Sequence, residues 1–165
     1  MMNNKSLETL IREELARVKA SVTPTDNVVL SLAKQLSAAV EEEAARIGVN
    51  AVVAISDRAA RPVLVHVMED AYIASYDVAL QKAYTVVALK MSTMDLKPLA
   101  QPGGSLYGIQ FTNDGQIVIF GGGEPLKAGG RVIGGLGVSG GSEEQDAALA
   151  AYGAKVFARL VGASD

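Results

Sequence analysis

The chain of 165 residues contains no cysteine and no tryptophan, and His66 is its only histidine. The absence of cysteine excludes disulfide bonds, thiolate nucleophiles and cysteine-based zinc sites. With one histidine and no nucleophile-elbow sequence, a Ser-His-Asp hydrolase is not supported. Histidines and carboxylates are also not clustered at the spacing of metal ligands. The sequence therefore argues against hydrolytic and metal-dependent enzymes.

Excess charge of one sign and long apolar runs are also absent. Lysine and arginine number 15 against 18 acidic residues, a net charge of −3, which gives no electrostatic footprint for nucleic acid or an anionic membrane. No window approaches the roughly 18 apolar residues of a membrane helix, and the charged N-terminus lacks the apolar segment of a signal peptide. We expect one cytoplasmic domain over residues 1–165, without nucleic-acid or membrane partners.

Glycine, by contrast, is abundant, with 17 residues, many of them in the last third of the chain. Glycines border two short apolar runs, Ile117 to Phe120 and Arg131 to Val138, which predict strands. Ala128-Gly129-Gly130 predicts the hairpin turn before the second of them. Ser142 and Gln145 form a capping box (S-x-x-Q) that opens a final helix.

The periodicity of apolar residues predicts the remaining elements. A break is expected at residues 94–98, where proline follows the third helical pattern. The expected helices cover residues 7–18, 23–47 (opening at Thr23-Pro24 and ending at Gly48) and 70–91, and the expected strands cover residues 49–56, 63–68 and 106–111. This order predicts an α+β fold, an antiparallel five-stranded sheet packed with helices.

The segments GGGEPL and RVIGGLGVSGGSEEQDAALAAYG closely resemble the GGxP, GxxxGxxGVSG and QDxxxAxxG signature of the GlcG/HbpS family, also found as the C-terminal domain of PduO-type corrinoid adenosyltransferases. The resemblance extends over residues 32–153 and includes Asp57-Arg58 and an S-x6-KA element at Ser75 and Lys82. At residues 67–69, Val-Met-Glu replaces the family's usual RMD-like triplet, so its arginine is missing.

This resemblance implies a profilin-like or PAS-like α/β/α sandwich that assembles into homo-oligomers. It implies haem or a corrinoid as ligand, and a link to glycolate use or to cobalamin-dependent diol and glycerol breakdown. Some members of the family bind haem through a histidine in the helical N-terminal part of the domain, where this chain has none. The adenosyltransferase activity of PduO proteins is expected to belong to a separate N-terminal helical domain without a counterpart here.

Gly135, Gly137 and Gly140 form a G-x-G-x-x-G pattern between a predicted strand and a predicted helix. A dinucleotide site also needs a second parallel strand with a ribose-binding acid, and too little chain follows to supply one. Two interpretations stay open. Backbone N–H groups at the start of the last helix bind a carboxylate or phosphate, or the glycines only allow tight packing and a turn.

Three polar residues are candidates for chemistry. Lys82, with Ser75 two turns earlier, either faces a ligand as a partly buried amine or forms an ion pair with a neighbour on the same segment (Asp77, Asp70 or Glu69). Glu124 follows three glycines at an expected turn, but has no second acid for general acid–base catalysis. His66 is either a packed or edge residue of its strand or a ligand to haem iron.

The leading hypothesis is a small-molecule-binding accessory protein that is not itself a catalyst. Its pocket is expected between sheet and helices, lined by Ser75, Lys82, Gly121, Gly122, Gly123, Glu124, Pro125, Gly137, Ser139 and Gly140. One alternative is an enzyme acting on a small hydroxy- or oxo-acid through Lys82 and Glu124. Another is a purely structural, partner-binding oligomer.

Overall fold

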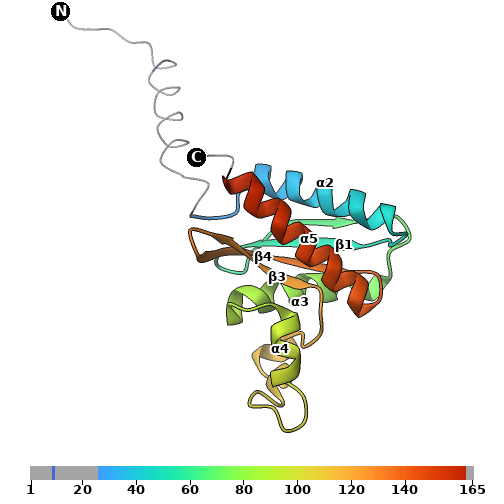
Figure 1. Cartoon of the computed structure of the whole chain (residues 1–165), viewed down its shortest axis with the longest axis vertical. Helices are drawn as coiled ribbons and strands as arrows, with labels where there is room; N and C mark the ends of the chain where they lie inside the picture. Colours follow the sequence, from blue (N-terminus) through green and yellow to red (C-terminus); the bar gives the residue numbers. More distant parts are fainter. Residues whose placement is uncertain (1–8, 10–25, 163–165) are drawn as a thin grey trace, which may run out of the picture.

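The computed structural model describes Thr9 and residues 26–162. The helix expected over residues 7–18, apart from Thr9, and the helix start at Thr23 therefore lie outside the described part. The described chain forms three layers, with a sheet between two layers of helices (Figure 1). The strands are β1 (Val52–Asp57), β2 (Pro62–Val67), β3 (Gly123–Ala128) and β4 (Arg131–Ser139), paired antiparallel in the order β2-β1-β4-β3.

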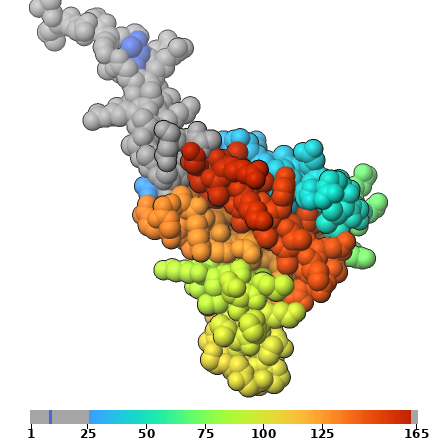
Figure 2. All heavy atoms as spheres, in the orientation of Figure 1, coloured from blue at the N-terminus to red at the C-terminus, as the bar shows by residue number. Residues whose placement is uncertain are grey.

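Helices cover both faces of this sheet. On one face, α2 (Leu30–Arg46) and α5 (Glu143–Gly162) lie side by side, and on the other face lies α3 (Ile73–Leu89) (Figure 1). The short helix α4 (Thr93–Leu99) and two 3-10 turns, η1 (Ile109–Phe111) and η2 (Asn113–Gly115), follow α3. The segment from α4 to η2 protrudes from the sandwich (Figure 2).

The central strand β1 is buried along its whole length. Because side chains alternate across a strand, Val53 and Ile55 join the larger core with α2 and α5, while Val52 and Ala54 pack against α3. The apolar run of this strand therefore reflects burial on both faces.

Two glycines of β4 set the distance between α3 and the sheet. A Cβ atom on Gly137 would lie 2.0 Å from the carbonyl oxygen of Ala79, and one on Gly135 would lie 2.3 Å from that of Ala83. Any side chain at these positions would push the helix away from the strand. The packing interpretation accounts for these two glycines of the G-x-G-x-x-G pattern.

The sheet has four strands, so the prediction of five is wrong. Residues 106–111 form turns and the 3-10 turn η1, and Gly108 has a φ of 90° that no regular strand accommodates. The run Ile117 to Phe120 is not a strand either. Its backbone is held by a side chain of α3, because Val118 N donates to Thr85 Oγ1 at 3.0 Å.

The second expected helix begins later than its sequence signals indicate. Helix α2 starts at Leu30, and residues 26–29 are not helical. Asn27 Oδ1 accepts hydrogen bonds from Val28 N and Arg58 N, and Val28 N also donates to Ile133 O. The bonds to Arg58 and Ile133 hold this non-helical segment against the sheet.

Other boundaries agree with the sequence. Gly48 follows the end of α2 with a φ of 72°, and Gly129 and Gly130 form the β3–β4 turn with φ values of 53° and 76°. The capping box is present at the start of α5, where Ser142 N donates to Gln145 Oε1 and Gln145 N donates to Ser142 Oγ. The break after α3 is also present, although residues 94–98 belong to the short helix α4 rather than to a loop.

Candidate functional site

Helix α3, the end of β4 and the first turn of α5 meet around a buried ion pair. Lys82 Nζ donates to Asp146 Oδ2 at 2.9 Å and to the carbonyl oxygen of Val138 at 2.8 Å. The side chains of Lys82 and Asp146 are 0% and 5% exposed. The pair therefore connects the two helix layers at one end of the sheet.

The surroundings of Lys82 are shaped to enclose its ammonium group. The ring of Phe120 lies over it, with its centroid 5.0 Å from Nζ, a cation–π geometry. A Cβ atom on Gly122 would lie 2.5 Å from Nζ, so only glycine leaves room for the amine there. Burial lowers the pKa of Lys82, and the charge of Asp146 opposes that shift.

The partner of Lys82 differs from the sequence-based expectation. Lys82 forms its ion pair with Asp146 on α5, and not with Asp77, Asp70 or Glu69. The other carboxylate oxygen of Asp146, Oδ1, accepts from Gly141 N at 2.9 Å, so this acid also ties the loop before α5 to the helix.

Acceptors on α5 occupy two backbone N–H groups just before that helix and one just before β3. Gly141 N donates to Asp146, Ser142 N to Gln145, and Gly121 N to Glu143 Oε1. The Gly121 N–H and then the ammonium of Lys97, 2.7 Å away, lower the pKa of Glu143. Because these amides already have acidic or amide partners, they are not free to bind an external carboxylate or phosphate.

A cavity of about 360 Å³ opens beside the ion pair. Ser139 Oγ donates to Ser75 Oγ at 3.1 Å in its wall, and both serines are buried. Its lining consists of Tyr72, Ala74, Ser75, Val78, Phe120, Ser139, Gly141, Glu143 and Asp146. Lys82 lies behind Phe120 and Asp146, outside this lining.

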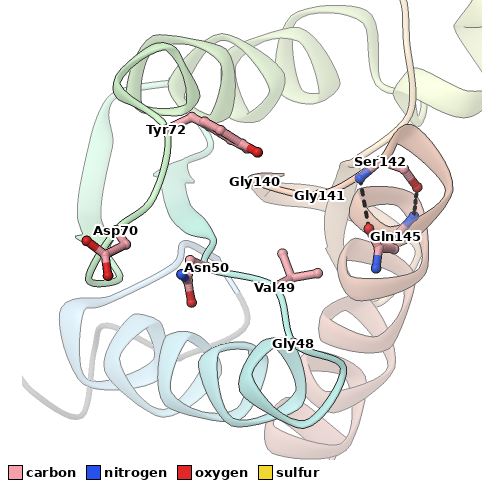
Figure 3. A pocket seen from close by; sticks show the side chains of 9 residues that line it. All are labelled: Gly48, Val49, Asn50, Asp70, Tyr72, Gly140, Gly141, Ser142 and Gln145. Atoms are coloured by element: carbon pink, nitrogen blue, oxygen red, sulfur yellow. Dashed lines mark hydrogen bonds between the residues drawn. The ribbon is translucent and has the colours of Figure 1, made fainter.

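A second cavity of about 490 Å³ adjoins the first and shares Tyr72 and Gly141 with it. Figure 3 shows the ring of Tyr72 extending from the start of α3 toward the loop at Gly140 and Gly141. Tyr72 is 72% exposed, so it forms a rim between the two cavities. The two cavities therefore lie next to each other at the end of β4.

Glu124 and Pro125, expected in a turn, lie within β3. Proline is tolerated because β3 is an edge strand. Gly123 faces α3 and α4, where its N–H donates to Thr93 Oγ1 at 2.9 Å, so alternation turns Glu124 to the α5 face. Burial, followed by the charge of Asp95, raises the pKa of Glu124. Glu124 therefore points to the face of the sheet opposite the one that α3, with Lys82, covers.

His66 lies away from the pocket, on the edge strand β2. It is opposite Val53 in the strand pairing and so faces α2, where its Nδ1 is 2.8 Å from Glu41 Oε1. Its side chain is 49% exposed. His66 is thus a half-exposed residue of an edge strand that contacts α2.

Sequence reasoning missed Tyr72 and Phe120 as pocket residues and Asp146 as the partner of Lys82. The two aromatic residues adjoin irregular segments, where no periodicity indicates a direction. Asp146 is 64 residues from Lys82, a separation over which a single sequence carries no pairing signal.

Among residues 26–162 and Thr9, no group of three or more His, Cys, Asp or Glu side chains is arranged to hold a metal ion. Within the same part of the chain, every helix is too short or too polar to span a bilayer.

The fold and site define a three-layer α+β domain with an open pocket at the carboxyl end of its longest strand and a buried Lys–Asp pair behind it. The chain belongs to the HbpS-like family: the model described as haem degrading protein HbpS-like matches residues 28–155. The sequence resemblance to GlcG/HbpS proteins is thereby confirmed.

Two curated relatives are similar over most of the chain. A 15.0 kDa protein from the dhaT-dhaS intergenic region of Citrobacter freundii is 44% identical over 81% of this chain and 94% of its own length. The corrinoid adenosyltransferase PduO of Salmonella typhimurium is 40% identical over 86% of this chain. The match covers only 44% of that enzyme, so the chain spans less than half of it.

Two solved structures share the fold. Protein ORFY of Klebsiella pneumoniae superimposes with a TM-score of 0.79 at 36% identity, covering 96% of this chain and 97% of its own. The PduOC:Heme complex superimposes with a TM-score of 0.73 at 40% identity, covering 76% of this chain and 91% of its own.

Proposed function

We propose that this chain is a small-molecule-binding protein of the HbpS-like family, active in the cytoplasm as a homo-oligomer, with haem or a corrinoid as its ligand. The observation that carries the proposal is the pair of adjoining cavities at the end of β4, with Tyr72 in the lining of both and Phe120 in the lining of one. The haem complex of a protein 40% identical to this one supports the ligand class.

The pocket suits a flat, largely apolar ring with polar edges. Each of its two parts has a volume within the range of about 300–1,000 Å³ that is typical of ligand sites. Two aromatic side chains offer ring surfaces, and the Ser75–Ser139 pair offers hydroxyl groups. The residues therefore fit a tetrapyrrole, which would supply the metal-centred chemistry.

Tyr72 is the residue that we propose to face the metal. Histidine, cysteine, methionine and tyrosine are the side chains that bind haem iron, and tyrosine is the one of these four types in the lining of the two cavities. Its exposed phenol at the shared rim can approach a ligand from either cavity. His66, by contrast, lies on the other side of the sheet.

A visible-absorbance titration with haemin tests this proposal. We expect a saturable Soret shift with a one-to-one end point in the natural protein. Tyr72→Phe keeps the ring but removes the phenol oxygen, and we expect it to abolish the shift or to weaken binding strongly. Tyr76→Phe, on the same exposed end of α3, is the matched control and should bind normally.

Two outcomes would count against this assignment. Loss of the Soret shift in His66→Ala, with Tyr72→Phe unaffected, would move the site to the β2–α2 face. No shift in any variant, and none with cobalamin, would exclude both ligands and direct the search to other small molecules.

The enzyme alternative receives no support from the geometry. Lys82 Nζ already donates to two oxygens and has no exposed surface, and Glu124 faces α5. Borohydride trapping of a carbonyl compound on Lys82 would reinstate that alternative.

A further inference from the structure

A third cavity, of about 450 Å³, lies at the opposite end of β4 from the pocket described above. Lys90, Lys127, Gly130, Arg131 and Val132 line it. Its cationic side chains come from three elements: the residue after α3, strand β3 and the first residue of β4. We propose that this cavity binds a small molecule through a phosphate group. The proposal does not depend on the function of the other pocket.

The two lysines of this cavity have no acidic contact partner among the residues that the structure describes. Neither Lys90 nor Lys127 forms an ion pair with any residue in the described chain. Lys127 lowers the pKa of Glu124 at longer range, against the effect of burial. Arg131, in contrast, is bound to Asp26 at 2.7 Å. Two uncompensated ammonium groups in a protein of net charge −3 thus face one hollow.

The backbone at Lys90 gives a second indication. Lys90 ends α3 in the left-handed region, with φ 56° and ψ 31°. That position favours glycine, because a Cβ atom is strained there. A lysine at this point sacrifices local stability, and its charge at the rim of the cavity is a reason for its presence.

The β3–β4 hairpin supplies the other wall. Its pairing register shifts between Leu126 and Lys127, and the chain then turns through Gly129 and Gly130. Such a shift in register re-aims the side chains next to it. The shift in register therefore lies beside the wall of the cavity that Lys127 and Arg131 line.

The chemistry of the occupant follows from charge and size. A phosphate monoester carries about −1.5 to −2 charges at neutral pH, which matches two free ammonium groups. The volume exceeds that of a bare phosphate and lies within the range of small-molecule sites. The net negative charge of the protein disfavours a polyanion such as nucleic acid.

Titration of the 15N-labelled protein with inorganic phosphate at constant ionic strength tests the proposal. We expect saturable chemical-shift changes at the amides of Lys90, Lys127 and Gly130 to Val132, and a weaker response to acetate. Lys127→Gln and Lys90→Gly should each reduce the affinity for phosphate about tenfold, the loss expected for one charge-assisted contact. Lys34→Gln, an exposed lysine on α2, is the control and should bind as the natural protein does.

The variant Lys90→Gly separates binding from folding. Because it relieves the left-handed strain, we expect a higher melting temperature together with weaker phosphate binding. Unchanged affinity in both lysine variants would overturn the proposal, as would an equal response to acetate. Co-sedimentation with phosphatidylglycerol vesicles in the absence of a response to soluble phosphate would overturn it in favour of a lipid headgroup.

Discussion

Lys82 carries an ammonium group that has no exposed surface, and its neighbours offset part of the cost of burying it. Two oxygens accept hydrogen bonds from it, and the face of Phe120 covers it. Removing one partner from such a pair leaves an unmatched charge inside the protein, which costs more than the pair itself contributes. The pair thus fixes how α3 and α5 are placed around the pocket.

Breaking this pair should destabilise the fold. We expect Lys82→Met and Asp146→Asn each to lower the free energy of unfolding by about 3–5 kcal/mol, measured by urea denaturation. The double variant Lys82→Met/Asp146→Leu should lose less than the sum of the single losses, because it leaves no lone charge. Glu43→Gln, which removes an exposed pair with Arg46, should change stability little, and a loss equal to that of Lys82→Met would contradict this account.

Glu124 makes stability depend on pH in the opposite direction from a carboxylate stabilised by an ion pair. Burial and Asp95 raise its pKa in the folded protein, so its contribution is complete below the unfolded pKa of about 4.3 and is lost as the pH rises through the folded pKa. We expect Glu124→Gln to raise the melting temperature at pH 8 and to leave it nearly unchanged at pH 4. A gain of equal size at both pH values would indicate a packing effect instead.

Strands and helices could be predicted from the sequence wherever local signals and tertiary packing agree. Three local signals were sufficient to predict the ends of the adjoining elements: the glycine after α2, the turn at Gly129 and the cap at Ser142. The sequence failed for the run at residues 117–120, in which Ile117 and Val118 are buried without a neighbouring strand. There a hydroxyl of α3, on Thr85, replaces the missing backbone partner, and no periodicity encodes that bond.

The candidate site was predictable only in part for the same reason. Ser75 and Ser139, taken from family motifs, do meet in the pocket wall. Tyr72 and Phe120 could not be assigned, because their directions depend on how α3, α5 and β4 come together.

The close approach of α3 to β4 gives a further prediction. Gly137→Ala would place a methyl group 2.0 Å from a carbonyl oxygen of the helix, and we expect a loss of at least about 1–3 kcal/mol in unfolding free energy. Gly162→Ala is the control, since nothing lies within 4 Å of a Cβ atom there. Equal stabilities of the two variants in thermal unfolding would show that α3 can move away from β4 without a loss of stability.

Among the described residues, the most exposed large apolar side chains lie in two regions. At the start of α3, Ile73 is 96% exposed beside Tyr72, and Phe111 is 83% exposed on the segment from α4 to η2, which protrudes in Figure 2. Exposed apolar patches of this kind are typical of interfaces, which agrees with the proposed homo-oligomer.

Sedimentation equilibrium should therefore give a mass that is a multiple of the monomer. We expect Ile73→Asp to shift the distribution toward the monomer, because a charge would be buried at the contact. The exposed residue Lys155 on α5 provides the comparison, and Lys155→Asp should leave the mass unchanged. A monomeric natural protein would leave the exposed patch without this explanation.

Because Lys82 is enclosed, the rate at which it is chemically modified reports how often the sandwich opens. Amine-reactive reagents modify a lysine only when its Nζ meets solvent, so Lys34 and Lys155 should be acylated at once in the native protein. Lys82 should react only during the intervals in which α3 and α5 separate. Mass spectrometry of the labelled peptides would then record how often this protein exposes its interior, and whether a bound ligand keeps it closed.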